Sequence, residues 1–329
     1  MGQPITKKNM EFYTPDERWD IFGCPDFESF LNKYLVRGNF HKKVPEQVVD
    51  AYKTIEYLMA HAYYYYPMYD EALSKLLRTI EMAIKIRCKE LNIPTVVEKK
   101  KGNEIKRYDL TFNDLINKVC NEEKEKKLDF SLHRIREIRN MFMHPEFNSY
   151  MGGIIIFNIY FCVTILNTLF ADKSFFIKVN SELKSFENKL ANFKAKTMTF
   201  KRGSEYFLIH DLEIIDFFYI ENEDLFCFSI HPVIQITENI ILEKKVTGAP
   251  PICFPAKDVK ISENSILGID IKNNISFKID IIDSPEDQRV MEKYKEYINR
   301  QESFHLNIAG SEIVTAITRF RYEYYHLIH

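Results

Sequence analysis

The 329-residue chain contains little glycine, proline or cysteine. Its 10 glycines and 12 prolines argue against a fold organised by glycine-rich cofactor loops, and against a fibrous or disordered chain. The six cysteines include no C-x-x-C pair, so the sequence indicates neither a zinc site nor a disulfide framework. We therefore expect no metal, no cofactor and a reduced, cytoplasmic environment. The cysteines are Cys24, Cys88, Cys120, Cys162, Cys227 and Cys253.

The chain also lacks the overall basic excess that many nucleic-acid-binding proteins carry. Its net charge is −2 and its isoelectric point is near 6.5, so any site for a polyanion must be local. From Met68 to Pro145 there are 17 Lys or Arg against 13 Asp or Glu, a balance of +4. From Thr197 to Ile282 there are 8 against 13, a balance of −5. We expect a polyanion to bind the first segment rather than the second.

The chain does contain enough apolar sequence for folded domains, with 46% hydrophobic and 28% charged residues. At roughly 100 to 200 residues per domain, its length predicts two of them. Aromatic residues are abundant, and the run Tyr63 to Tyr66 could stack on bases. Four consecutive positions point all round a helix, however, so most of these tyrosines must lie in the core or an interface. The first 25 residues are polar and do not resemble a secretory signal.

Apolar residues recur at helical spacing from Pro45 to His144. One series starts at Val48, and Thr111 with Asp114 forms an approximate capping box before another. Together with the segment that follows, these series predict an antiparallel bundle of about five long helices.

The segment from Gly152 to Phe170 is almost continuously apolar and long enough to span a membrane. Weakly polar side chains nevertheless recur along it at helical spacing, and neither end carries a Lys or Arg cluster. We therefore predict a buried helix of the bundle and no membrane contact. The weakly polar positions are Tyr160, Thr164, Asn167, Thr168 and Ala171.

After Thr197 the pattern changes to short β-branched and aromatic segments separated by Gly, Asn, Asp and Pro. The predicted fold class is α+β: an N-terminal all-α bundle, then a small β-rich domain and C-terminal helices. Ser284 with Pro285 is expected to start one of these helices, and Ser311 to cap the last. The predicted organisation is an extension with a short helix over 1–44, the bundle over 45–172, a connecting helix over 173–196, the β-rich domain over 197–283 and the C-terminal helices over 284–329.

One motif carries side chains suited to chemistry: R-N-x-x-x-H-P, which begins at Arg139 near the end of a bundle helix. At about 100° per residue, Arg136, Asn140 and His144 share one face of that helix. Arg139 lies about 140° away from His144 on the same count. Pro145 disfavours helical geometry at His144 and lets the last turn open. The pair can then converge on one phosphate, or a second copy of the motif can complete the site.

This set of side chains can cleave RNA without a metal. His144 can take the proton of a ribose 2′-hydroxyl or give one to the leaving 5′-oxygen. Its position at a helix C-terminus favours the protonated form and so the acid role. Arg139 can bind the non-bridging oxygens and stabilise the charge that develops on them. Asn140 can orient the phosphate or the imidazole.

The motif, together with LRTIEMAIK at 77–85 on an earlier helix, resembles the HEPN superfamily over about 45–172. The resemblance implies a helical bundle that forms a homodimer and brings two R-x4-H motifs into one cleft. Many members are metal-independent endoribonucleases of toxin or antiphage systems, whereas others are non-catalytic binding modules. By position, Arg139 and His144 match the catalytic pair and Asn140 the polar neighbour. Glu81 matches the acidic position on the earlier helix.

Several assignments remain open on the sequence alone. Arg136 can contact phosphate or form a salt bridge, and Glu81 can be a surface partner of Lys85. The surrounding arginines Arg78 and Arg87 are expected to be solvated. Two further R-x4-H pairs lack the flanking Asn and Pro, and two histidines on predicted strands show no ligand pattern, so we interpret these histidines as structural. The pairs are Arg300/His305 and Arg321/His326, and the histidines are His210 and His231.

Two functional hypotheses follow. The first is an endoribonuclease, a toxin or antiphage effector, that acts on an RNA substrate as a homodimer and is controlled by a protein or small ligand at the β-rich domain. The second is a non-catalytic dimeric adaptor whose β-rich domain binds a protein or small ligand.

Overall fold

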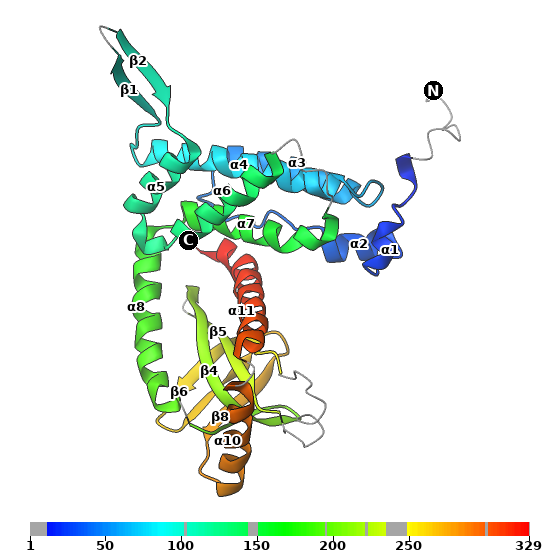
Figure 1. Ribbon diagram of the computed structural model, residues 1–329, viewed down its shortest axis with the longest axis vertical. Helices are drawn as coiled ribbons and strands as arrows, with labels where there is room; N and C mark the ends of the chain where they lie inside the picture. The colour runs from blue at the N-terminus through cyan, green and yellow to red at the C-terminus, as the bar shows by residue number, and fades with distance from the viewer. Residues whose placement is uncertain are drawn as a thin grey trace. The chain divides into compact units, whose positions relative to one another are not determined.

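The computed structural model describes residues 12–101, 104–143, 151–194, 196–220, 223–234, 249–299 and 302–328. Helices and strands occupy largely separate stretches of the chain, so the fold class is α+β, as the sequence predicts. The chain divides into two compact units, whose elements are labelled in Figure 1. Unit 1 comprises Met1–Lys173 and Tyr322–His329, and unit 2 comprises Ser174–Arg321.

In its described residues unit 1 is helical apart from one antiparallel hairpin, which projects from the helices (Figure 1). Its helices are α1 (Arg18–Ile21), α2 (Phe27–Tyr34), α3 (Glu46–His61), α4 (Met68–Glu90), α5 (Phe112–Glu122), α6 (Asp129–Met143) and α7 (Ile156–Phe170), with short 3-10 turns at Lys124–Lys126, Gly152–Ile155 and Tyr325–Leu327. The hairpin consists of β1 (Val96–Lys101) and β2 (Glu104–Asp109).

The N-terminal extension contains two helices in its described part, whereas the sequence predicts a single short one. Helix α1 carries Trp19, which is completely buried and donates from Nε1 to the Ala62 carbonyl oxygen at 2.7 Å. Helix α2 is capped by Asp26, whose carboxylate accepts the Ser29 N–H at 2.7 Å. The second helix is not apparent in the sequence, because elements of four and eight residues are too short to show a clear helical period.

Helix α4 is the central element of unit 1, because α3, α5, α6 and α7 all contact it. Its buried side chains follow the spacing that predicts the helix, from Leu73 to Cys88. The capping box of α5 is confirmed: the Thr111 hydroxyl accepts the Asp114 N–H at 3.2 Å, and the Asp114 carboxylate accepts the Thr111 N–H at 3.2 Å.

Helix α7 lies in the core of unit 1, with ten of its residues buried. By length and composition Gly152–Phe170 could cross a membrane, yet 67% of its most apolar window is buried inside the protein. This burial supports the prediction of a core helix. The predicted polar stripe on α7 is not solvated, since Asn167 is completely buried.

Asn167 fixes the loop between α2 and α3. Its side-chain oxygen accepts the His41 N–H at 3.1 Å, and its side-chain nitrogen donates to the Asn39 carbonyl oxygen at 2.8 Å. The His41 ring lies 2.8 Å from the Asn167 carbonyl oxygen through Nε2 and accepts the Lys43 N–H at Nδ1. This pattern suits a neutral imidazole, and burial lowers the pKa of His41.

A buried ion network joins the end of α4 to the turn after α5. Glu123, 2% exposed in its side chain, accepts from Lys126 Nζ at 2.8 Å and from Arg87 through both carboxylate oxygens. Lys126 also donates to the Leu169 carbonyl oxygen at 2.9 Å. Burial lowers the pKa of Lys126 to about 8. The expectation that Arg87 is solvated was therefore wrong, because tertiary packing places Glu123 beside it.

Unit 2 contains a closed antiparallel barrel in the order β3-β4-β5-β6-β7-β8, with β8 pairing back to β3. The strands are β3 (Met198–Arg202), β4 (Glu205–Ile220), β5 (Glu223–Pro232), β6 (Ile252–Ile261), β7 (Ser265–Asp270) and β8 (Ile275–Ile281). The helices are α8 (Lys173–Leu190), a 3-10 turn at Ala191–Phe193, α10 (Pro285–Asn299) and α11 (Glu302–Tyr324). Phenylalanines fill the barrel core: Phe200, Phe226, Phe228, Phe254 and Phe277 are each at most 3% exposed.

The start of α10 at Pro285 agrees with the sequence prediction, whereas the predicted start of the last helix does not. Helix α11 begins at Glu302 and continues through Gly310 and Ser311. A serine after a glycine is a common helix start, but the hydrogen-bonded helix runs on through both residues.

We expect Glu123→Ala to destabilise unit 1 by about 3 to 5 kcal/mol, because it leaves Lys126 and Arg87 without their buried counter-charge. Glu90→Ala is the matched control, since Glu90 also pairs with Arg87 but is 41% exposed and should cost less than about 1 kcal/mol. Urea unfolding followed by the fluorescence of the single Trp19 measures both variants. Equal losses would contradict the dominant role of the Glu123 network.

Protonation of His41 should destabilise unit 1 at acidic pH. Its folded pKa lies below the ordinary value of 6.5, so the unfolded chain takes up a proton first and stability falls as the pH drops below about 6.5, by up to ~1.4 kcal/mol per pH unit. His41→Gln should lower stability at pH 7 but flatten this dependence. The test is the urea midpoint of the native protein and of His41→Gln across pH 5.5 to 7.5, about one unit on either side of the ordinary pKa. If the two midpoints fall in parallel as the pH drops, the loss of stability does not come from His41.

Candidate functional site

The R-N-x-x-x-H-P motif begins on the last turn of α6, facing α4. Arg139 Nη2 donates to Glu81 Oε2 at 2.9 Å, and Lys85 Nζ lies 3.2 Å from the other Glu81 oxygen. The guanidinium of Arg139 also lies 5.6 Å from the ring centre of Phe112 on α5. Glu81 therefore bridges the two basic residues, and its pairing with Lys85 is the surface contact that the sequence predicts.

Arg139 keeps hydrogen-bonding capacity beyond this ion pair. Its Nη1 has only a long contact, 3.4 Å, with the Asn140 side-chain oxygen. The Nε atoms of Arg136 and Arg139 are buried and have no hydrogen-bond partner in the described structure. Arg136 makes no ion pair within the same described ranges, so the salt-bridge alternative finds no partner there. Unpaired buried donors are rare in folded proteins and call for a partner.

His144 and Pro145 lie outside the described residues, and α6 is described as far as Met143. The structure therefore brings together Arg139, Glu81 and Asn140 of the predicted site. The assignment of His144 to this site rests on the sequence alone.

The chain is held firmly where it returns after residue 150. Asp70, in the first turn of α4, accepts the N–H groups of Met151 and Gly152 at 2.9 Å each. Tyr66 donates its hydroxyl to the Met151 carbonyl oxygen at 3.0 Å. Burial raises the pKa of the Asp70 carboxyl, and these backbone hydrogen bonds oppose that rise. Asp70 and Tyr66 thus anchor the segment that follows the motif.

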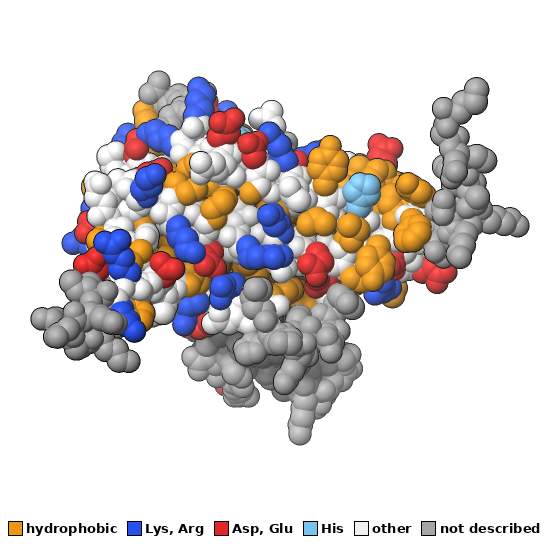
Figure 2. Space-filling view, turned by 90° about the horizontal axis from the view of Figure 1, so that it is seen from above, with side chains coloured by type: hydrophobic (Ala, Val, Ile, Leu, Met, Phe, Trp, Pro, Cys, Tyr) orange, Lys and Arg blue, Asp and Glu red, His pale blue; other side chains and the backbone are white. Residues whose placement is uncertain are grey.

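A shallow groove of about 510 Å³ runs along α4 beside Glu81. Exposed Arg78, Lys85 and Lys89 line it at helical spacing, with the side chains of Met82 and Ile86 between them. Figure 2 views the molecule from the side of α3 and α4, where Lys and Arg side chains gather apart from a hydrophobic group. The groove gives the local basic surface that the segment charge predicted.

The tyrosine run is mostly part of the core. Tyr63 and Tyr66 are each 5% exposed, and Tyr66 packs on Trp19 with ring centres 4.8 Å apart. Tyr65, by contrast, is 59% exposed and is the member of the run whose ring is open to solvent.

The other R-x4-H pairs do not form a comparable site in the described structure. Arg321 donates from Nε to Asp216 at 2.6 Å, and the Asp216 side chain is 6% exposed. Burial lowers the pKa of His326, whose Nδ1 is buried without a hydrogen-bond partner among the described residues. Arg300 and the side chain of His305 lie outside the described residues.

Sequence reasoning missed the anchor at Asp70, and it predicted a local basic surface without placing it in a groove on α4. The signal for the anchor in the sequence is the glycine at position 152, and the structure gives the reason for it: Gly152 has φ +48° and its added Cβ would lie 1.8 Å from a Tyr66 ring carbon. The groove has a weaker signal, three basic residues at positions 78, 85 and 89 on one helix face. The anchor becomes specific only when the fold brings the turn at Gly152–Ile155 to the start of α4.

The chain matches no family model, and comparison with curated proteins and with solved structures found no match.

Substitution of Gly152 tests the anchor. Gly152→Ala combines backbone strain of about 1–2 kcal/mol with overpacking against Tyr66 of about 1–3 kcal/mol, so we expect unit 1 to lose about 2 to 5 kcal/mol in total. Gly23→Ala is the matched control, because Gly23 has φ +67° but only Lys33 Nζ near its added Cβ, at 3.9 Å. Urea unfolding should show the larger loss for Gly152→Ala; losses of equal size would exclude the steric contribution.

Proposed function

We propose that the protein is a metal-independent endoribonuclease of the HEPN type, with Arg139 and His144 as its catalytic pair. The observation that carries the proposal is the Arg139–Glu81 ion pair at the end of α6, 2.9 Å long. This ion pair fixes the Arg139 guanidinium, which keeps N–H groups available for a phosphate, five residues before His144. The basic groove on α4 supports it, because a phosphate backbone could follow Arg78, Lys85 and Lys89 to the pair.

The reaction divides between these side chains. His144 takes the 2′-hydroxyl proton while the 2′-oxygen attacks phosphorus and the bond to the 5′-oxygen breaks. A 2′,3′-cyclic phosphate forms, and an imidazolium, favoured at a helix C-terminus, returns a proton to the 5′-oxygen. Arg139 binds the non-bridging oxygens. Glu81 is a positioning residue, and Asn140 orients the phosphate or the imidazole.

We further propose a cytoplasmic homodimer that acts as a toxin or antiphage effector on an RNA substrate. A second copy of the motif would supply the second imidazole that the acid and base roles need. Unit 2 would then bind a protein or small ligand that controls cleavage. If the pair is inactive, the same architecture serves the adaptor function in which unit 2 is the binding module.

The test is cleavage of labelled RNA by the purified full chain in excess EDTA. We expect His144→Ala to lower the rate by about 10²–10⁴-fold and Arg139→Ala by about 10²–10³-fold. Arg134→Ala is the control. Arg134 is an exposed arginine of the same helix, α6, and its guanidinium lies over the Phe161 ring. The cleavage rate of this variant should stay within about twofold of the native rate.

Circular dichroism and chromatography establish that the variants fold and assemble as the native chain does. Undiminished cleavage in both Ala variants would exclude the catalytic pair, and cleavage that EDTA abolishes would exclude a metal-independent mechanism. RNA binding without cleavage by the native protein would favour the adaptor.

A further inference from the structure

The register of β4 and β5 brings three metal-ligating side chains together in unit 2. Asp211 of β4 pairs directly with His231 of β5, and Glu213 follows two residues later on the same face of β4. A β-bulge between Ile209 and Asp211 sets this register. One ligand atom from each of the three side chains lies within 4.8 Å of the other two.

This set has the chemistry of a transition-metal site rather than of a general acidic surface. Two carboxylates alone would attract any cation, whereas an imidazole selects zinc-like ions over magnesium and calcium. Zinc bonds to oxygen and nitrogen of about 2.0–2.2 Å require ligand atoms about 3.4 Å apart in a tetrahedron. Asp211 and His231 are half-buried and Glu213 is exposed, so side-chain rotations can close the remaining gap.

The imidazole is backed by a buried polar pair. Ser229 is completely buried, and its hydroxyl lies 3.4 Å from His231 Nε2. Ser229 pairs across the sheet with Cys253 and is hydrogen-bonded to its thiol. Burial raises the pKa of the Cys253 thiol, and Cys253 does not belong to the group of three ligand atoms. A metal-bound histidine usually has such a partner, which orients its ring.

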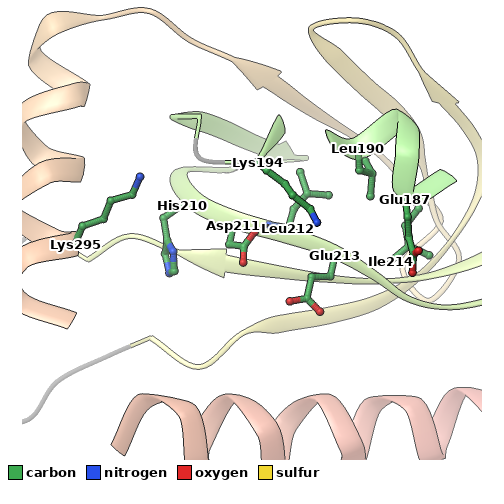
Figure 3. A pocket seen from close by; sticks show the side chains of 9 residues that line it. All are labelled: Glu187, Leu190, Lys194, His210, Asp211, Leu212, Glu213, Ile214 and Lys295. Carbon is green, nitrogen blue, oxygen red and sulfur yellow. Dashed lines mark hydrogen bonds between the residues drawn. The ribbon is translucent and has the colours of Figure 1, made fainter. Parts of the chain in front are cut away.

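Asp211 and Glu213 also line a pocket of about 670 Å³. Figure 3 shows Asp211 and Glu213 leaving β4 on one side, with Lys194 and Lys295 reaching in from other elements. A zinc ion with three protein ligands keeps an open position for water or another ligand. Lys194, Lys295 and Glu187 line the pocket together with these two carboxylates.

We propose that Asp211, Glu213 and His231 bind one divalent transition-metal ion of the zinc class. The site lies in unit 2, and the proposal does not depend on RNA cleavage. It replaces the interpretation of His231 as a purely structural histidine, and the absence of a C-x-x-C pair does not bear on it because none of its ligands is cysteine.

Equilibrium dialysis of the full-length chain, stripped with EDTA and desalted, tests the site with ZnCl₂ as the probe. We expect one Zn²⁺ per chain that equimolar Mg²⁺ does not displace. Glu213→Gln and His231→Gln should each weaken Zn²⁺ binding by at least about tenfold. His133→Gln is the matched control, because His133 also lies near a carboxylate, 3.5 Å from Asp129, but within unit 1; it should bind Zn²⁺ as the native chain does.

Co²⁺ provides a second readout, since a visible absorption band reports its coordination by nitrogen and oxygen. The band should appear in the native chain and weaken in His231→Gln. Because Glu213 is exposed, Glu213→Gln is expected to fold, and circular dichroism checks this. A native chain that retains no Zn²⁺, or Zn²⁺ binding unchanged in a folded Glu213→Gln, would overturn the proposal.

Discussion

Unit 1 is built around the need to bury α7 on nearly every side. A helix with so little polar surface is stable in water only when other elements surround it. Helices α4 and α6 contact it, and Asn167 ties the loop before α3 to its last turns. The end of the chain joins this core as well, because Tyr322 packs on Tyr160 with ring centres 4.6 Å apart. Hydrogen bonding of Asn167 satisfies a polar group that would otherwise be costly to bury.

The burial of α7 also constrains the candidate site. The chain must enter α7 through the turn at Gly152–Ile155, and Asp70 with Tyr66 fixes that turn to the start of α4. Farther along α4, Glu81 accepts a hydrogen bond from Arg139 of α6. Anchor and ion pair therefore lie on one rigid element, which suits a site whose groups must be held in place.

In unit 2 the alternation of strand side chains separates packing from chemistry. Along β4, Leu212 and Ile214 are buried, whereas Asp211 and Glu213 lie on the opposite face. The barrel core and the proposed metal site thus use the same strand without competing for positions. The two units can accordingly carry different functions, with the candidate nuclease site in one and the proposed metal site in the other.

Local sequence patterns predict the fold class of this protein and its candidate motif. Helical spacing, the Thr111 cap and the β-branched segments after Thr197 predict the α+β class, because these signals lie within a few residues of each other. The motif at Arg139 is likewise visible in the sequence. Tertiary structure alone decided that Arg87 is buried against Glu123, that Asp70 anchors Gly152, and that Asp211, Glu213 and His231 meet. Each of these contacts joins residues that are far apart in the chain or depends on a strand register, and a register is set by a bulge and by packing rather than by spacing along one segment.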